Sequence, residues 1–112
     1  MTFYMLFDIN GLKSSLGKGR IQWQRHALER IFQRGIARKD VFEVLKNGEV
    51  IEEYPDDKPW PAVLFLGWIN NQPLHVVAAY SRKLKTIAII TVYEPSLDYF
   101  ENDFRTRRRK NA

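Results

Sequence analysis

The sequence predicts an α+β fold in which N-terminal helices pack on one face of a roughly four-stranded antiparallel sheet. Apolar residues recur at helical spacing up to residue 47, and after it they form short extended runs. Short connections join these runs, which favours an antiparallel meander. Helices that all precede the strands are typical of an α+β layer.

The helical part begins with a segment at residues 8–16, where Ile9, Leu12 and Leu16 share one face and Gly17 ends the pattern. A third helix is expected at residues 38–46, and its stop signal is Asn47-Gly48. Ala37 stands at its cap position and offers no side-chain acceptor.

The clearest element lies between these two, at residues 22–33. Its apolar side chains follow the spacing of a helix with one buried face, namely Trp23, Ala27, Leu28, Ile31 and Phe32. Gly35 is well placed to terminate it.

Four strands are expected at residues 49–54, 62–69, 74–80 and 86–93, with Pro95 ending the ladder. The chain of 112 residues suits a single domain over 1–112, with a core at about 8–105 and a basic tail at 105–112. No apolar run approaches the roughly 20 residues needed to cross a bilayer, and the apolar start lacks the features of a signal peptide. We expect a cytoplasmic protein with no membrane partner.

A line of polar side chains follows the second helix, because His26, Arg30 and Arg34 are four residues apart. We expect them to be partly buried at the border of helix and sheet. Arginine grips phosphate through a planar fork and histidine transfers protons near neutral pH, so a phosphate site is one interpretation. In the other, the line is a structural edge: His26 bonds a strand carbonyl and the arginines pair with glutamates (Glu29, Glu53 or Glu94).

His75 lies mid-strand and by alternation shares a face with Val77 and Ala79, opposite Leu74 and Val76. A core histidine is usually just hydrogen-bonded. RNA cleavage by acid and base catalysis needs two proton-transfer groups, so a histidine that meets His26 would be more significant.

Thr91 and Tyr93, near the end of the last strand, are expected to share a face with Ile87 and Ile89. Tyr93 can stack on a base or stabilise charge through its hydroxyl, but tyrosine is also simply favoured in strands.

Other kinds of site are disfavoured. The chain has no cysteine, which excludes a disulfide scaffold, a zinc-thiolate site and a cysteine nucleophile. Its two histidines lack metal-ligand spacing, and Asp56-Asp57 resemble turn residues. There is no glycine-rich phosphate loop and no serine elbow. We therefore expect no metal and no cofactor.

The net charge of +5 is partly concentrated at the C-terminal end, in Arg105, Arg107, Arg108, Arg109 and Lys110. Such a cluster attracts nucleic acid non-specifically. A solvated, frayed tail has the same composition.

Several motifs resemble those of the bacterial domain-of-unknown-function family 4258, over about residues 8–105. They are a His-Ala-x-x-Arg core followed by Arg-Gly-Ile, then Asn-Gly-Glu, Tyr-Pro-Asp, Pro-Leu-His-Val-Val and Ile-Thr-Val-Tyr-Glu-Pro. In this chain they occupy residues 26–36, 47–49, 54–56, 73–77 and 90–95.

The helix-then-meander order of this family is similar to the RelE, MqsR and BrnT toxins, which are small basic ribonucleases. Its genes often neighbour zinc-finger genes that resemble the antitoxin MqsA. The resemblance implies a toxin of a type II toxin–antitoxin pair that cleaves mRNA without a metal ion. Its expected partners are RNA, free or on the ribosome, and a cognate MqsA-like antitoxin.

With residue chemistry, the resemblance gives two groups of candidate residues. The catalytic candidates are His26, Arg30, His75 and Tyr93. The substrate-binding candidates are Arg34, Arg82, Lys83, Thr91, Arg107 and Arg108. The alternative is a non-catalytic RNA- or protein-binding module, in which an exposed Trp60-Pro61 loop is the anchor.

Overall fold

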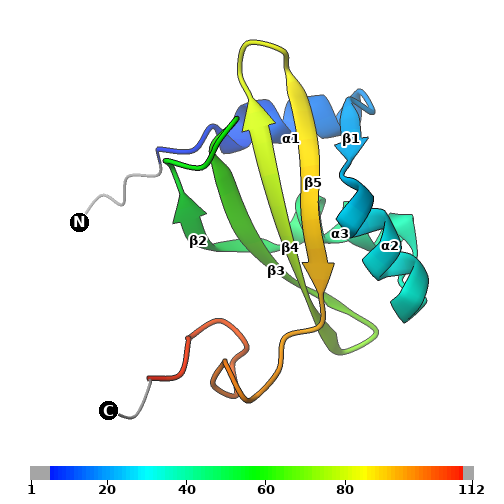
Figure 1. Cartoon of the computed structure of the whole chain (residues 1–112), viewed down its shortest axis with the longest axis vertical. Helices are drawn as coiled ribbons and strands as arrows, with labels where there is room; N and C mark the ends of the chain where they lie inside the picture. Colours follow the sequence, from blue (N-terminus) through cyan, green and yellow to red (C-terminus); the bar gives the residue numbers. More distant parts are fainter. Residues whose placement is uncertain (1–5, 110–112) are drawn as a thin grey trace.

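The protein is described here by a computed structural model of residues 6–109. Lys110 of the basic cluster and the first five residues lie outside this range. The described chain contains three helices and five strands (Figure 1): α1 (Ile9–Gly17), β1 (Ile21–Trp23), α2 (Arg25–Arg34), α3 (Arg38–Asn47), β2 (Glu49–Tyr54), β3 (Ala62–Ile69), β4 (Gln72–Ser81) and β5 (Thr86–Tyr93). The α+β prediction is confirmed, and no described helix is long and apolar enough to cross a membrane.

The sheet is mixed, with strand order β1-β5-β4-β3-β2. The meander from β2 to β5 is antiparallel, as predicted. The prediction of four antiparallel strands is wrong in one respect, because β1 pairs with β5 in parallel. Two of its three residues, Gln22 and Trp23, lie in the range predicted for the second helix, which instead begins at Arg25. A strand this short has no periodicity of its own, so only its pairing with β5 identifies it.

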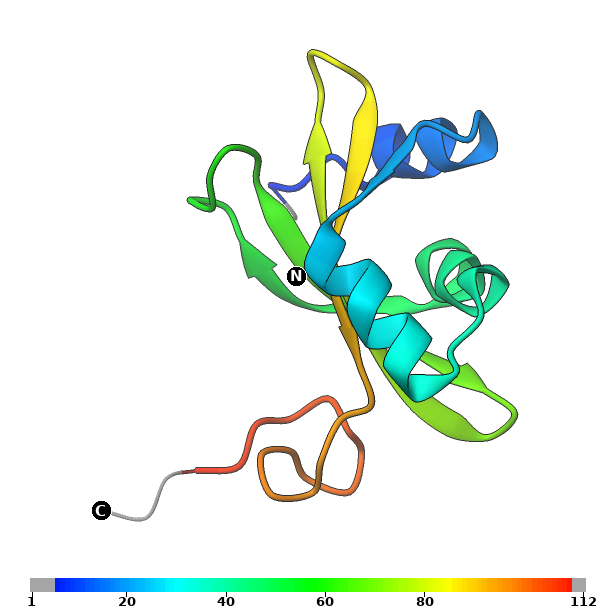
Figure 2. The same cartoon turned by 45° about the vertical axis from the view of Figure 1, so that its right-hand side comes forward.

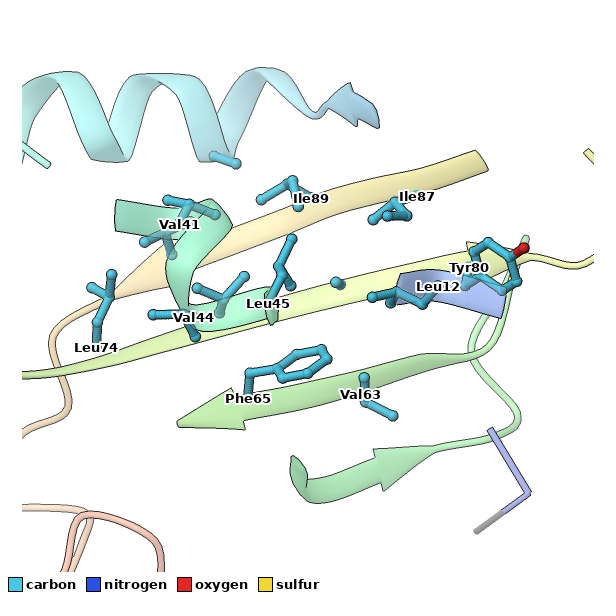
Figure 3. Close-up of a cluster of buried hydrophobic side chains, with 14 of the residues drawn as sticks. Leu12, Val41, Val44, Leu45, Val63, Phe65, Leu74, Tyr80, Ile87 and Ile89 are labelled. Carbon is cyan, nitrogen blue, oxygen red and sulfur yellow. The ribbon is translucent and has the colours of Figure 1, made fainter. Parts of the chain in front are cut away.

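All three helices cover one face of the sheet, and the opposite face carries no helix (Figures 1 and 2). We call the latter the helix-free face. The main core lies under the helices, where Leu12, Val41 and Leu45 meet Phe65 and Ile89 (Figure 3). Each of these side chains is essentially removed from water, and burial on this scale is the main favourable term in folding.

Helix α2 buries a narrower stripe than predicted. Ala27 and Ile31 are buried, and Gly35 ends the helix in the left-handed conformation at φ 66°. The prediction that Phe32 is buried is wrong, because its side chain is 88% exposed. Residue 32 is about 100° around the helix from residue 31, and of these two neighbours only Ile31 lies in the core.

A β-bulge reverses the faces of the residues at the end of β5. Val77 pairs with Thr91 but Ala78 pairs with Ile89, so Ile90 is an extra residue on β5. The prediction that Thr91 shares a face with Ile89 is therefore wrong, and so is the same prediction for Tyr93. Ile87 and Ile89 lie in the core under the helices, whereas Thr91 and Tyr93 lie on the helix-free face.

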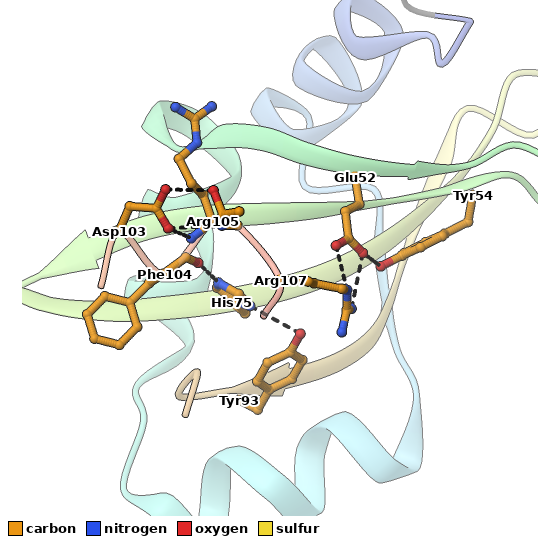
Figure 4. A network of polar contacts seen from close by, with 9 residues as sticks. Glu52, Tyr54, His75, Tyr93, Asp103, Phe104, Arg105 and Arg107 are labelled. Carbon is orange, nitrogen blue, oxygen red and sulfur yellow. Dashed lines mark hydrogen bonds and ion pairs between the residues drawn. The ribbon is translucent and has the colours of Figure 1, made fainter. Parts of the chain in front are cut away.

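The segment after β5 folds back against the helix-free face of the sheet (Figure 4). It closes on itself through a β-bridge between Phe100 and Arg107 and a hydrogen bond of 2.9 Å from Arg108 N to Tyr99 O. We call residues 94–109 the C-terminal segment. The interpretation of this region as a frayed tail is wrong for residues 105–108, whose arginines are held by ion pairs.

Candidate functional site

His75 lies at the centre of a polar cluster on the helix-free face (Figure 4). It is fully buried and, as predicted, projects opposite to Leu74 and Val76, which lie in the core under the helices. Its Nε2 lies 2.6 Å from Phe104 O and its Nδ1 lies 3.1 Å from Tyr93 Oη. A carbonyl only accepts, so Nε2 carries a proton and donates it. In the neutral ring, Nδ1 then accepts from the Tyr93 hydroxyl.

Aromatic neighbours keep the imidazole uncharged at neutral pH. The rings of Phe100 and Tyr93 stand edge-on to His75, with centroids 4.7 and 5.1 Å away. Burial lowers the pKa of His75, and the carbonyl of Phe104 and the Glu52 carboxylate offset this only in part. Neutral His75 therefore fixes the hydroxyl of Tyr93 as a donor to Nδ1.

A second group of the cluster is a carboxylate gripped by an arginine. Arg107 donates to Glu52 through Nε at 2.6 Å and through Nη2 at 3.1 Å, and the Tyr54 hydroxyl donates to the same carboxylate. Burial opposes ionisation of Glu52, but the bonds from Arg107 and Tyr54 outweigh it and lower the pKa of this carboxyl. Glu52 is therefore ionised at neutral pH.

The two tyrosines of the cluster remain protonated over the physiological range. Burial and the bond to the Glu52 carboxylate raise the pKa of Tyr54 to about 12. Burial also raises the pKa of Tyr93, and the charge of Arg107 opposes this without cancelling it. Both hydroxyls are consequently donors rather than bases.

The C-terminal segment positions Arg107 through its own turn. Asp103 accepts hydrogen bonds from the backbone amides of Arg105 and Thr106 at 3.0 and 2.9 Å, and these bonds lower its pKa. The guanidinium of Arg107 also lies 4.9 Å from the centroid of the Phe100 ring, a cation–π contact. Arg107 is thus held over the sheet from both sides while remaining partly open to solvent.

The line of residues on α2 lies elsewhere. Arg30 is half-buried, but His26 and Arg34 are exposed rather than partly buried as predicted. Helix α2 packs on β5 through the other face of the sheet, so the structure does not bring His26 to His75. Among the described residues, the expected pairs of these arginines with glutamates do not form; Glu29 pairs with Arg25 instead.

The remaining candidates are dispersed. Arg82 and Lys83 are exposed in the turn between β4 and β5, where Arg82 pairs with Asp8 at 3.5 Å. Thr91 lies half-buried on the helix-free face, paired with Val77. Arg108 pairs with Glu101 at 2.9 Å within the C-terminal segment.

Of the predicted site residues, the structure therefore brings together His75, Tyr93 and Arg107. Glu52 and Tyr54 complete this cluster and were missed. Their i, i+2 spacing in a predicted strand places a carboxylate and a phenol on one face. This spacing is the sequence feature that could have indicated both residues as members of the site. We refer to Glu52, Tyr54, His75, Tyr93 and Arg107 as the polar cluster. The described residues contain no group of three or more acidic or histidine side chains placed to hold a metal ion.

A comparison with protein families identifies the chain. The model of a domain of unknown function (DUF4258) matches residues 23–94. This protein belongs to that family. The matched range covers β2, β4 and β5, and so includes every member of the polar cluster except Arg107. No curated protein and no solved structure matches the chain.

Proposed function

We propose that this DUF4258 protein is a metal-independent endoribonuclease that acts on mRNA as the toxin of a type II toxin–antitoxin pair. One observation carries the proposal. An ionised carboxylate, a guanidinium and protonated hydroxyls, from Glu52, Arg107, Tyr54 and Tyr93, meet on one sheet face. These are the groups that transfer protons and stabilise charge when a 2′-hydroxyl attacks the adjacent phosphate.

Each group has a role in that reaction. Glu52 takes the proton of the 2′-hydroxyl as its oxygen bonds to phosphorus. Arg107 moves part of its fork from Glu52 to the non-bridging oxygens and stabilises their developing charge. Tyr93 turns its hydroxyl proton from His75 Nδ1 to the 5′-oxygen. It gives up that proton as the P–O5′ bond breaks, which leaves a 2′,3′-cyclic phosphate and a 5′-hydroxyl. His75 is a positioning residue, because it is buried and acts through Tyr93.

Exposed cations outside the polar cluster would hold the RNA backbone by charge alone. Arg34 and Lys83 are free to do so, since neither has an ion-pair partner among the described residues. The ribosome and an MqsA-like antitoxin are the proposed partners, and they rest on the family resemblance alone.

The chain itself offers a matched pair of variants for the test. Glu52→Gln removes the proposed base and its bonds to Arg107. Glu49→Gln removes the parallel ion pair to Arg105, at 2.8 Å, in the same C-terminal segment. Purified protein should cleave free RNA equally well with and without EDTA, or cleave mRNA on ribosomes in the Mg²⁺ that ribosomes themselves require. We expect Glu52→Gln to lower the rate about 10²- to 10⁴-fold and Glu49→Gln to have little effect.

Arg107→Lys and Arg105→Lys form a second pair, because lysine keeps the charge and loses the planar fork. Expression of the wild type should arrest growth, and Glu52→Gln should relieve the arrest. The proposal fails if the wild type leaves RNA intact in both settings, or if Glu52→Gln cleaves as fast as the wild type.

A second candidate is a non-catalytic RNA- or protein-binding module, which the complete burial of His75 favours. In that case RNA binding or partner binding survives Glu52→Gln and no cleavage product forms.

A further inference from the structure

A row of residues that pair from strand to strand crosses the helix-free face next to the polar cluster. Tyr54 pairs with Ala62, Ala62 with Ala79, and Ala79 with Ala88, and β1 adds Gln22 opposite Ala88. The row therefore runs through all five strands. With strands spaced by about 4.8 Å, it is roughly 19 Å wide from Tyr54 to Gln22.

The side chains along this row form a trough. Its three central positions are alanines, whose short side chains leave an apolar depression in the middle of the face. Tyr54 and Trp60 pack against these alanines from one side, and Gln22 and Gln24 line the other. The hollow lined by Trp60, the three alanines and the two glutamines has a volume of about 190 Å³. That is below the roughly 300–1,000 Å³ of sites for drug-sized ligands, which suits one flat ring system.

Trp60 has a different environment from the one expected of an exposed anchor. It is half-buried, because it packs against the alanines at the side of the hollow. An aromatic ring held at the wall of an apolar hollow offers a stacking surface. The glutamine amides opposite it are donors and acceptors that remain exposed to an incoming ligand.

We propose that this trough binds a nucleobase of the RNA next to the cleaved phosphate. Proteins read single-stranded RNA by stacking bases on aromatic side chains and by hydrogen bonds to base edges. Trp60 supplies the first, and Gln22 and Gln24 the second. Asp57 and Lys58 also line the hollow, and Lys58 adds a cation for the backbone. The choice of an RNA base as ligand rests on the proposed ribonuclease function.

Tyr54 connects the trough to the polar cluster. Its ring packs against the alanine floor while its hydroxyl donates to Glu52. The two residues are one strand repeat apart, about 7 Å along β2. A nucleotide with its base in the trough can therefore extend its phosphate along this face toward Glu52 and Arg107.

The test measures binding of short 2′-O-methylated RNA oligonucleotides of each base, which lack the attacking hydroxyl and cannot be cleaved. Trp60→Leu and Gln24→Ala alter the trough. Trp68→Leu and Gln33→Ala are their controls, since both residues are exposed outside it. Thermal unfolding tests whether each variant folds. Gln24 is exposed, so Gln24→Ala keeps the fold even if Trp60→Leu does not.

We expect the wild type to prefer one base. Trp60→Leu should weaken binding of that oligonucleotide at least fivefold, the low end of about five- to 150-fold for a lost stacking partner. Gln24→Ala should reduce the preference, and the controls should change neither.

Equal binding of all four oligonucleotides by the wild type, or unchanged binding by both trough variants, overturns the trough as a base site. The two proposals can fail separately. Binding through the trough without any cleavage of unmodified RNA removes the ribonuclease function and keeps the base site. Cleavage of RNA that the trough variants leave unchanged removes the base site and keeps the ribonuclease function.

Discussion

Replacing His75 by phenylalanine separates its hydrogen bonds from its packing. Phenylalanine keeps the ring against Phe100 and Tyr93 but removes both bonds, to Phe104 O and Tyr93 Oη. Each bond contributes about 0.5–1.5 kcal/mol net, so the loss is about 1–3 kcal/mol. For a domain of this size that corresponds to a fall in Tm of roughly 4–20 °C.

Urea unfolding at pH 7.5 measures this loss directly. His26→Phe is the matched control, because His26 is exposed and its replacement should change the free energy of unfolding by less than about 0.5 kcal/mol. A double-mutant cycle with Tyr93→Phe should give a coupling of about 1 kcal/mol between the two side chains. A loss of unfolding free energy below about 0.5 kcal/mol for His75→Phe, or no coupling with Tyr93→Phe, would refute the conclusion that the two hydrogen bonds of His75 stabilise the fold.

Acidification and two further substitutions test other parts of the fold. The pKa of His75 is lowered from 6.5 in the folded state, so below about pH 6.5 the unfolded chain binds a proton that the folded chain does not. Stability should therefore be full above that pH and decline on acidification, and His75→Phe should remove this decline in urea titrations. Gly67→Ala would place a Cβ 2.6 Å from Val44 Cγ2, which should cost about 1–3 kcal/mol of unfolding free energy. Because Val44→Ala removes that clash, the double variant should lose less unfolding free energy than the sum of the two single variants. Phe32→Gln, at a position 88% exposed, should shift the unfolding free energy by less than about 0.5 kcal/mol.

The helices and the meander were predictable because their information is local. The apolar spacing of α1 and α3, the stop at Gly48 and the four long strands come from residues that are neighbours in the sequence. Alternation also placed His75 correctly on the face opposite Leu74, since no bulge interrupts β4 between them.

The polar cluster was only partly predictable. His75 and Tyr93 stand out in the sequence as polar groups in apolar strands, but Glu52 lies in a run with Glu53 and resembles an ordinary solvated carboxylate. Its importance comes from Arg107, 55 residues away. A pairing over that separation leaves no mark on local periodicity.

The sequence by itself determined the existence of the three helices and the four strands of the antiparallel meander. The tertiary structure alone decided three things: the parallel pairing of β1, the reversal of Thr91 and Tyr93 by the bulge at Ile90, and the folding of the C-terminal segment onto the sheet. The physical reason is common to all three. Each depends on which backbone and side-chain groups satisfy one another across the sheet, and those partners are assigned only when the strands assemble.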